Sequence, residues 1–255
     1  MQKLVTTILA AVALSASVSA MAQIEVSGNV TLASDYRFRG ISQLEGEFSP
    51  AIQGGFDIAG GPGLYAGVWA SNVNFTGGAI ETDLYAGWGF DITEGITGDV
   101  GFMYYGYPEE DDQDLDYWEV YGSVSFWKAK IGLNYSDDYF AETGKFFYVY
   151  GDLSFPFAER YSVDAHLGYS AFDDDQLQDN INLPFFGECV LSGFMCNEDK
   201  YLDWSLGVTA SDVAGVDISL TYIGIDADEE DFGLSGSEAA DLVDDTVVLA
   251  ISKSL

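Results

Sequence analysis

The amino-acid sequence predicts an all-β protein, a transmembrane antiparallel up-and-down β-barrel of about twelve strands. Three observations lead to this fold class. Apolar and polar residues alternate with a period of two over much of the chain, the connections between the alternating stretches are long and short in turn, and aromatic residues gather near the stretch ends. Together they favour strands that cross a bilayer with one face toward lipid and the other toward a polar interior.

The alternation begins at residues 24–32, where apolar or small residues occupy the even positions and polar residues the odd ones. A strand built in this way has one apolar and one polar face, because successive side chains point to opposite sides. The same pattern returns at residues 52–58, 64–71, 80–91, 98–107, 118–126, 129–135, 147–155, 161–169, 202–209, 216–225 and 247–251. These stretches have the length that crosses a bilayer when a strand is tilted.

The connections alternate in length along the chain. Long ones occupy residues 37–49, 72–79, 108–116, 136–145, 171–200 and 226–245. Short ones lie between them at residues 59–63, 92–96, 156–159 and 211–215, and at the tight turn around Trp127. Short periplasmic turns and longer external loops produce this alternation in an up-and-down barrel, so we expect an even number of strands and both termini on the periplasmic side.

Aromatic placement separates the barrel from a soluble β-sandwich, which shares the alternation but buries its apolar face between two sheets. Near the stretch ends stand Tyr36, Phe38, Trp88, Phe90, Tyr104, Tyr105, Tyr107, Tyr117, Trp118, Phe126, Trp127, Phe155 and Phe157. This distribution is typical of aromatic girdles at two membrane interfaces. The last residue, Leu255, departs from the Phe or Trp with which substrates of the barrel-assembly machinery usually end.

The N-terminus indicates export. Lys3 precedes an apolar run over residues 4–20, and Ala20 and Ala22 form an A-x-A cleavage pattern. We expect residues 1–22 to be a signal peptide and residues 23–255 to be one outer-membrane β-barrel domain. An uncleaved membrane anchor is the alternative, although the run is short and is interrupted by Thr and Ser residues.

The chain has 42 acidic residues against 9 basic ones, which gives a formal net charge of −33. Phosphate backbones would be repelled, so we expect no nucleic acid as a partner. The acids crowd into residues 108–116, 173–175 and 226–231, which fall in predicted loops. Such loops either bridge to lipopolysaccharide phosphates through divalent cations or form a solvated acidic surface.

Cys189 and Cys196 lie close together in one predicted loop. In an exported protein such a pair usually forms a disulfide, and we expect it to staple this loop. A free thiol pair and a metal site are the alternatives, but the single histidine lies elsewhere in the sequence and does not complete a zinc set.

The segment at residues 32–43 reads LASDYRFRGISQ, and the run Asp-Tyr-Arg-Phe-Arg-Gly within it is unusual. With this segment the chain resembles the TorF family of outer-membrane porins of Gram-negative bacteria. Further similar segments lie at residues 50–54, 64–73, 81–87 and 106–108. The likeness is densest before Tyr121 and runs from the predicted signal peptide to Leu255. It implies a barrel in the outer membrane with a pore.

The polar faces of the predicted strands supply candidates for a pore lining. The polar face of the first strand reaches Asp35, and if its parity continues it also holds Arg37 and Arg39 near the outer end. Opposed charges in a lumen either constrict a pore and select ions or pair as a structural plug. The pore-lining candidates are Asp35, Arg37, Arg39, Asp57, Glu81, Asp83, Glu119, Asp152 and His166. Because acids outnumber bases among them, a conducting lumen should favour cations.

Two patterns could carry other chemistry. His166, the only histidine, falls on a polar face beside Asp164, but no nucleophile elbow or lipase motif accompanies it, so we expect a hydrogen-bonded lumen residue and no enzyme. Residues 112–116 have calcium-like spacing, yet Tyr117 stands where an EF-hand needs glycine and Ser123 where it needs glutamate. We therefore predict no metal site and no cofactor.

These observations predict a passive diffusion channel for small polar, and particularly cationic, solutes. We expect the barrel-assembly machinery of the outer membrane to insert it, and lipid and lipopolysaccharide to surround it. About twelve strands fall between eight-stranded barrels, which side chains fill, and sixteen-stranded porins, which hold an aqueous channel. The alternative is a closed structural or adhesive barrel that acts through its acidic external loops.

Overall fold

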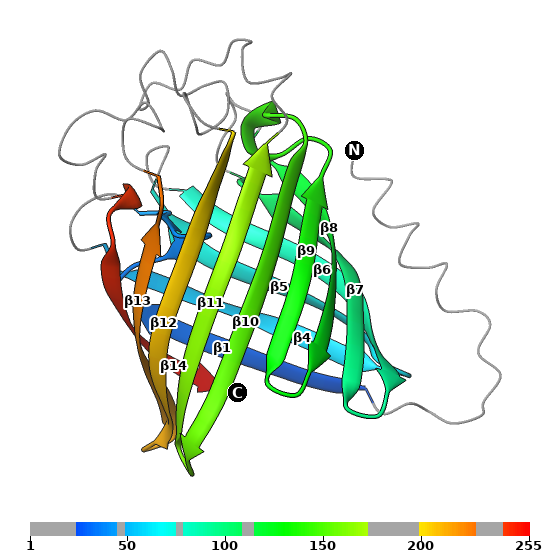
Figure 1. Cartoon of the computed structure of the whole chain (residues 1–255), viewed down its shortest axis with the longest axis vertical. Coiled ribbons are helices and arrows are strands. Elements are labelled where there is room, and N and C mark those ends of the chain that lie inside the picture. The colour runs from blue at the N-terminus through cyan, green and yellow to red at the C-terminus, as the bar shows by residue number, and fades with distance from the viewer. Residues whose placement is uncertain (1–23, 45–48, 75–78, 109–114, 173–198, 228–241) are drawn as a thin grey trace.

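The computed structural model describes residues 24–44, 49–74, 79–108, 115–172, 199–227 and 242–255. Twelve strands form a closed antiparallel barrel (Figure 1). They are β1 (Glu25–Ala33), β4 (Ala51–Gly60), β5 (Leu64–Val73), β6 (Ala79–Thr93), β7 (Ile96–Gly106), β8 (Tyr117–Phe126), β9 (Ala129–Ser136), β10 (Phe146–Ala158), β11 (Tyr161–Phe172), β12 (Lys200–Val213), β13 (Val216–Ile225) and β14 (Thr246–Ser254). The predicted signal peptide and the predicted Cys189–Cys196 disulfide lie outside the described residues.

Each barrel strand pairs with the strands before and after it, so the topology is up-and-down and the predicted fold class is confirmed. The seam is closed by β1 and β14, where Asn29 pairs with Ser254 and Ala33 with Ala250. The short turns lie together at the lower end of the barrel in Figure 1, which we call the inner end. We call the opposite end, where the longer connections depart, the outer end.

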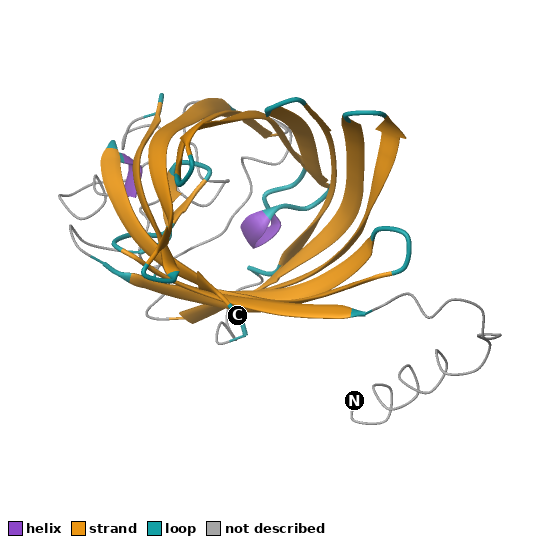
Figure 2. Cartoon of the chain, turned by 90° about the horizontal axis from the view of Figure 1, so that it is seen from below, coloured by secondary structure: helices purple, strands orange, loops and turns teal. Residues whose placement is uncertain are grey.

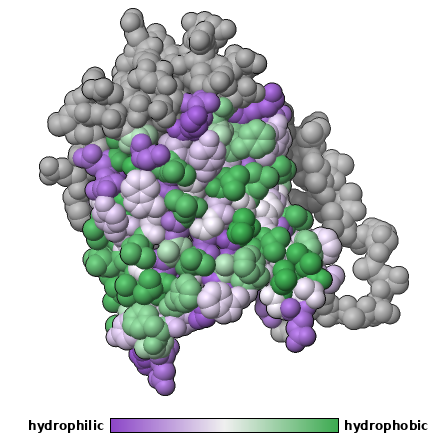
Figure 3. All heavy atoms as spheres, in the orientation of Figure 1, coloured by the Kyte–Doolittle hydropathy of each residue, from purple (hydrophilic) through white to green (hydrophobic). Residues whose placement is uncertain are grey.

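The outward-facing side chains of the barrel are apolar. Val26, Ile52 and Phe56, for example, are 68%, 64% and 62% exposed. On the face shown in Figure 3, apolar residues cover much of the barrel wall and strongly hydrophilic ones lie at the tips of the short turns. An apolar outer wall of this kind is what a lipid-embedded barrel presents, while the alternate side chains point into the lumen.

Between β1 and β4 the chain turns into the lumen as a short hairpin, β2 (Arg37–Phe38) and β3 (Ile41–Ser42). We call residues 35–44 the inserted hairpin. Its two turn residues, Arg39 and Gly40, have φ angles of 49° and 84°, the left-handed conformation that tight hairpin turns need. Glycine also fits because a Cβ at position 40 would lie 2.3 Å from a side-chain carbon of Ile225.

The prediction that Arg37 and Arg39 continue the polar face of the first strand is therefore wrong. β1 ends at Ala33, and both arginines reach the lumen on the inserted hairpin. Strand parity requires an extended backbone, and the left-handed turn at residues 39–40 replaces it with a chain reversal. Both arginines still lie in the barrel interior, but their positions are set by the hairpin.

A cluster of buried aromatic side chains fills part of the lumen at the outer end. Its aromatic members, which we call the aromatic cluster, are Tyr105, Tyr107, Tyr117, Tyr139, Phe140, Phe146, Phe172, Tyr148 and Tyr201. Phe140 comes from a short 3-10 helix, η1 (Phe140–Glu142), in the connection between β9 and β10. Phe38 of the inserted hairpin packs against this cluster. Seen from below in Figure 2, the ring of strands has loop segments lying across its opening.

No helix in the described part of the chain is long and apolar enough to span a membrane.

The aromatic residues predicted to form girdles do not all face outward. Those with exposures from 36% to 76% are Trp88, Tyr104, Phe126, Trp127, Phe155 and Phe157. In contrast, Tyr105, Tyr107 and Tyr117 are at most 5% exposed and belong to the aromatic cluster, and Tyr36 and Phe38 of the inserted hairpin pack against it. For these five residues the girdle prediction is wrong, because their side chains lie in the barrel interior.

A charge on the outer wall should destabilise the barrel. Leu220 lies in the middle of β13, faces outward and is 54% exposed, so Leu220→Arg places a guanidinium in lipid. We expect the free energy of unfolding to fall by about 2–4 kcal/mol. Urea titration of the refolded protein in lipid vesicles measures this. Val213→Arg, at the inner end of β12, is the matched control and should cost at most about 1 kcal/mol. A loss in Leu220→Arg as small as that would place Leu220 outside the lipid.

Candidate functional site

An ion pair anchors the inserted hairpin to the far wall of the barrel. Nη2 of Arg39, in the hairpin turn, donates hydrogen bonds to both carboxylate oxygens of Glu119 on β8, each at 2.8 Å. The side chains of Arg39 and Glu119 are only 5% and 0% exposed. Asn134 on β9 donates a further hydrogen bond of 2.8 Å to the same carboxylate. The hairpin that starts at β1 is thus fixed to β8 across the lumen.

Aromatic rings surround the Arg39 guanidinium. Its central carbon lies 4.4 Å from the ring centroid of Tyr148, 4.6 Å from that of Phe38 and 4.7 Å from that of Phe146. Burial alone would lower the pKa of Arg39, but the Glu119 carboxylate raises it above its ordinary value. The guanidinium therefore stays charged, and the ring faces add cation–π attraction to the ion pair.

Arg37 ties the base of the inserted hairpin to the segment before β14. Its Nε donates to Asp35 at 2.5 Å. Its Nη1 lies within hydrogen-bonding distance of the carbonyl oxygens of Gly40, Leu242 and Asp244, at 3.2, 2.9 and 3.1 Å. One guanidinium therefore connects the start of the hairpin, its turn and the chain that enters the last strand.

A third polar contact fixes the start of the inserted hairpin. The hydroxyl of Tyr36 donates to Oε1 of Glu81 on β6 at 2.6 Å, and the hydroxyl of Tyr107 donates to Oε2 of the same residue at 2.8 Å. Burial raises the pKa of the Tyr36 phenol, and the Glu81 carboxylate raises it further, so the phenol remains a donor. The buried Glu81 carboxylate has both of its oxygens satisfied.

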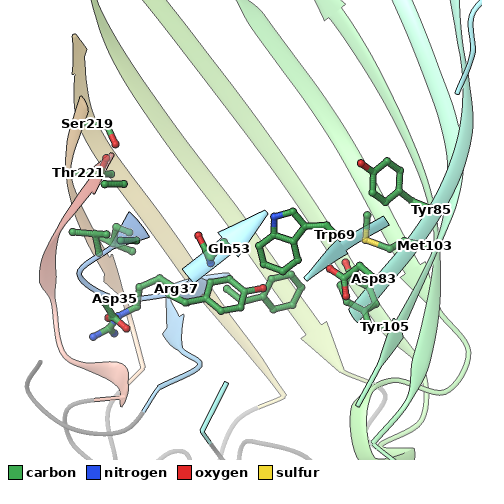
Figure 4. A pocket seen from close by; sticks show the side chains of 16 residues that line it. Asp35, Arg37, Gln53, Trp69, Asp83, Tyr85, Met103, Tyr105, Ser219 and Thr221 are labelled. Carbon is green, nitrogen blue, oxygen red and sulfur yellow. The ribbon is translucent and has the colours of Figure 1, made fainter. Parts of the chain in front are cut away.

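Two sizeable cavities adjoin the inserted hairpin. The larger, of about 610 Å³, is lined by Asp83 together with Gln53, Trp69 and Tyr85, and we call it the Asp83 cavity. Figure 4 shows Asp83, Tyr85, Met103 and Tyr105 on one side of it and Asp35 and Arg37 on the other. The smaller, of about 380 Å³, is lined by Asp152, His166 and Asp203. Arg37, Phe38, Tyr105 and Ile223 contribute to both, so the two cavities lie next to each other.

His166 is the centre of a hydrogen-bonded group in the smaller cavity. Its Nδ1 lies 2.6 Å from Asp152, and its Nε2 lies 3.1 Å from Asp203 and 2.7 Å from the hydroxyl of Tyr148. Each ring nitrogen thus has a carboxylate partner, and the group joins β10, β11 and β12. Two flanking carboxylates and a phenol therefore hold the ring in place.

The predicted pore-lining residues fall into three places. Those gathered around the inserted hairpin are Asp35, Arg37, Arg39, Glu81, Asp83 and Glu119. Asp152 and His166 line the smaller cavity. Asp57 on β4 accepts a hydrogen bond from Tyr85. The acids contribute most of the charge at these places, and both arginines are paired with one of them.

The pore-lining prediction missed the tyrosines. Tyr36, Tyr105 and Tyr107 contact its buried acids, and Tyr105 donates to Glu119 at 3.3 Å. Tyr105 and Tyr107 have odd numbers, as does Asp99, the lumen acid of β7, so the period-two pattern could have predicted that both tyrosines point inward. Tyr36 lies on the inserted hairpin, where parity gives no signal.

The acidic segment with calcium-like spacing is described only from residue 115 onward. Asp116 accepts hydrogen bonds from the backbone N–H of Tyr107 at 2.7 Å and from the hydroxyl of Tyr104 at 2.5 Å. This carboxylate therefore connects the ends of β7 and β8. Within the described ranges, no three His, Cys, Asp or Glu residues are placed to hold a metal ion.

The fold and its outer wall define a transmembrane β-barrel whose lumen is acid-lined and crossed by a hairpin. The chain belongs to the bacterial family Gcw_chp, described as a bacterial protein of unknown function, which it matches over residues 17–182 and 191–255. The resemblance of residues 32–43 to the TorF family stays a prediction.

Solved structures share the barrel fold with this chain. A structure of KdgM porin has a TM-score of 0.53 at 6% identity, covering 89% of this chain and 97% of the other. A structure from work titled "Unveiling the Mechanism Behind the in-meso Crystallization of Membrane Proteins" has a TM-score of 0.51 at 9% identity, covering 90% and 83%. Both likenesses concern the fold. Comparison with curated proteins found no similar sequence.

Removing Arg39 should destabilise the protein strongly, because Glu119 would be left as a buried and poorly compensated carboxylate. We expect Arg39→Ala to lower the free energy of unfolding by about 3–5 kcal/mol. The control is Lys200→Ala, which breaks the exposed pair with Asp199 (3.6 Å) and should cost less than about 1 kcal/mol. Urea titration in lipid vesicles compares them, and similar losses in both variants would contradict a buried anchor.

Proposed function

We propose that this protein is an outer-membrane channel for the passive diffusion of small polar solutes, with a preference for cations. The observation that carries the proposal is a closed barrel with an apolar outer wall and a polar, acid-lined interior that contains cavities of about 610 and 380 Å³. Side chains that point into an aqueous lumen must be solvated or paired, and these cavities provide the space for water and solute.

The inserted hairpin is the constriction of the proposed channel. It contacts the barrel wall at Glu81 and Glu119 and approaches the chain before β14 through Arg37. Eight-stranded barrels are filled by side chains and sixteen-stranded porins are open, so a twelve-stranded barrel with one inserted segment has an intermediate lumen. A segment held by a few charged contacts can narrow such a lumen and select by charge.

Cation preference follows from the balance of charge near the constriction. Three carboxylates of the barrel wall, Glu81, Asp83 and Glu119, lie next to the inserted hairpin. The hairpin itself carries one further carboxylate, Asp35, and the guanidinium groups of Arg37 and Arg39. Deeper in the lumen, Asp57 and Asp152 add negative charge. A low-dielectric wall strengthens the field of these charges, so cations concentrate in the lumen and anions are repelled.

We also propose that the protein is located in the outer membrane, with lipid, lipopolysaccharide and the barrel-assembly machinery as partners. An apolar wall suits the lipid of the outer membrane, lipopolysaccharide would surround the outer end, and the barrel-assembly machinery would insert the chain. The resemblance of residues 32–43 to the TorF family of porins supports this location, as does the barrel fold shared with KdgM porin. The proposal includes no covalent step.

A closed structural or adhesive barrel is the second candidate. The observation that favours it is the packing at the outer end, where the aromatic cluster leaves a cavity of only about 20 Å³ next to Phe38. That space holds about one water molecule. In this case the inserted hairpin is a plug, and the function depends on the external loops.

Conductance of the refolded protein in a planar lipid bilayer separates the two candidates. A channel should give steady current steps whose reversal potential in a KCl gradient favours K⁺, and Asp57→Asn should weaken this preference because it removes a lumen charge. Asp212→Asn, which removes an exposed charge at an inner turn, is the control and should change it little. A folded barrel that carries no current would support the closed barrel.

The hairpin anchor should control the size of the current. Arg39→Ala removes the contact between the hairpin turn and Glu119, so we expect a larger single-channel conductance as the hairpin moves away from β8. Arg160→Ala is the matched control, because Arg160 is 58% exposed at an inner turn and pairs with Asp212 outside the lumen. An unchanged conductance in Arg39→Ala would show that the hairpin does not restrict the pathway.

A further inference from the structure

Asp83, a buried carboxylate with one oxygen unpartnered among the described residues, lines a cavity to which five aromatic side chains also contribute. We propose that the Asp83 cavity is a binding site for an organic cation, a small solute that carries an ammonium or quaternary ammonium group. The proposal names a class of solute for the proposed channel. It depends on the channel function only because the solute must reach the cavity through the lumen.

Asp83 supplies the first argument. The residue is only 6% exposed, and its Oδ1 is buried with no hydrogen-bond partner among the described residues. Glu81, two residues earlier on the same inward face of β6, accepts hydrogen bonds from two tyrosines. The two acids are close together, yet both oxygens of Glu81 have donors, whereas Oδ1 of Asp83 has none among the described residues. A buried carboxylate without a partner is strongly unfavourable, and a bound cation would provide the missing partner.

The positive charges near the cavity already have partners. Nη2 of Arg39 donates to both carboxylate oxygens of Glu119 on the far wall. Arg37, although it lines the cavity, donates to Asp35 and to backbone carbonyl oxygens. The excess of carboxylates over guanidinium groups around the inserted hairpin therefore leaves Asp83 available to a cation from outside the chain.

The walls of the cavity decide which kind of cation fits. Trp69, Tyr85 and Tyr105 line it together with Asp83, and Figure 4 shows Trp69 between Asp83 and the hairpin. Tyr36 packs edge-on against Trp69, with ring centroids 5.5 Å apart, and extends the aromatic wall. Mg²⁺ and Ca²⁺ require about six or more oxygen ligands, whereas ammonium groups with alkyl substituents bind ring faces beside a carboxylate.

The size of the cavity agrees with a small organic solute. About 610 Å³ lies within the range of about 300–1,000 Å³ that is usual for small-molecule sites. Gln53, Ser219 and Thr221 also line the cavity and offer hydrogen bonds to hydroxyl or carbonyl groups of such a solute. Choline, with a quaternary ammonium and one hydroxyl group, is a suitable probe.

Isothermal titration calorimetry on the full-length protein, refolded in detergent micelles, tests the proposal. We expect choline to bind, and its uncharged isostere 3,3-dimethyl-1-butanol to bind at least about tenfold more weakly, because only choline carries the positive charge. Equal affinities, or no binding of choline, would overturn the proposal.

Variants locate the site. Asp83→Asn keeps the shape and removes the charge, so it should weaken choline binding by about tenfold or more, and Trp69→Leu should weaken it by about three- to tenfold. Asp164→Asn is the matched control: this lumen acid on β11 bonds to Ser154 and Ser162 away from the cavity, and choline affinity should stay within about twofold. Circular dichroism confirms that each variant is folded.

The outcomes separate this proposal from the proposed function, because binding in micelles needs no current. Choline binding that depends on Asp83 in a protein without conductance would support the site and remove the channel. Current steps in a protein that does not bind choline would support the channel and remove the site. If Asp164→Asn weakens binding as much as Asp83→Asn, the effect is general lumen charge and the site is overturned.

Discussion

The contact between Arg39 and Glu119 determines the form of the lumen. Without it, the inserted hairpin would be tied to the barrel mainly at its base, through Arg37 and Tyr36, and its turn would be free of β8. The pair is costly to form because both groups leave water, and the surrounding rings and the Asn134 amide offset part of that cost. Its geometry is more specific than a hydrophobic contact, since hydrogen bonds between charged groups constrain both distance and direction.

The constraint behind this arrangement is the size of the barrel. Twelve strands enclose more space than side chains from the wall can fill, and every polar group inside needs water or a partner. At the outer end the aromatic cluster and the inserted hairpin fill the space, while deeper in the lumen the two cavities remain. The proposed conduction and the proposed cation binding both depend on these cavities.

Sequence patterns predicted the barrel well because strand parity is a strictly local property. Val26, Ile52 and Leu220 were assigned to the outer face by position alone, and all three are exposed on the wall. The same rule failed at Arg37 and Arg39, where a left-handed turn interrupts the extended backbone. Parity alone places Tyr105 and Tyr107 in the lumen, where the structure has them, although aromatic residues at strand ends are typical of interface girdles. Long-range partners such as Glu119 for Arg39, 80 residues away, leave no trace in a single sequence.

The sequence by itself determined an up-and-down barrel of about twelve strands, the apolar outer face of those strands and the acidic character of the lumen, because these depend on residue type and a period of two. Only the tertiary structure decided that residues 35–44 fold into the barrel, that Arg39 pairs with Glu119, and that Glu81 has two donors while Oδ1 of Asp83 has none within the described part of the chain. The physical reason is that a hydrogen bond requires a distance near 3 Å between particular atoms. Such distances exist only once the barrel has closed and the hairpin has entered it.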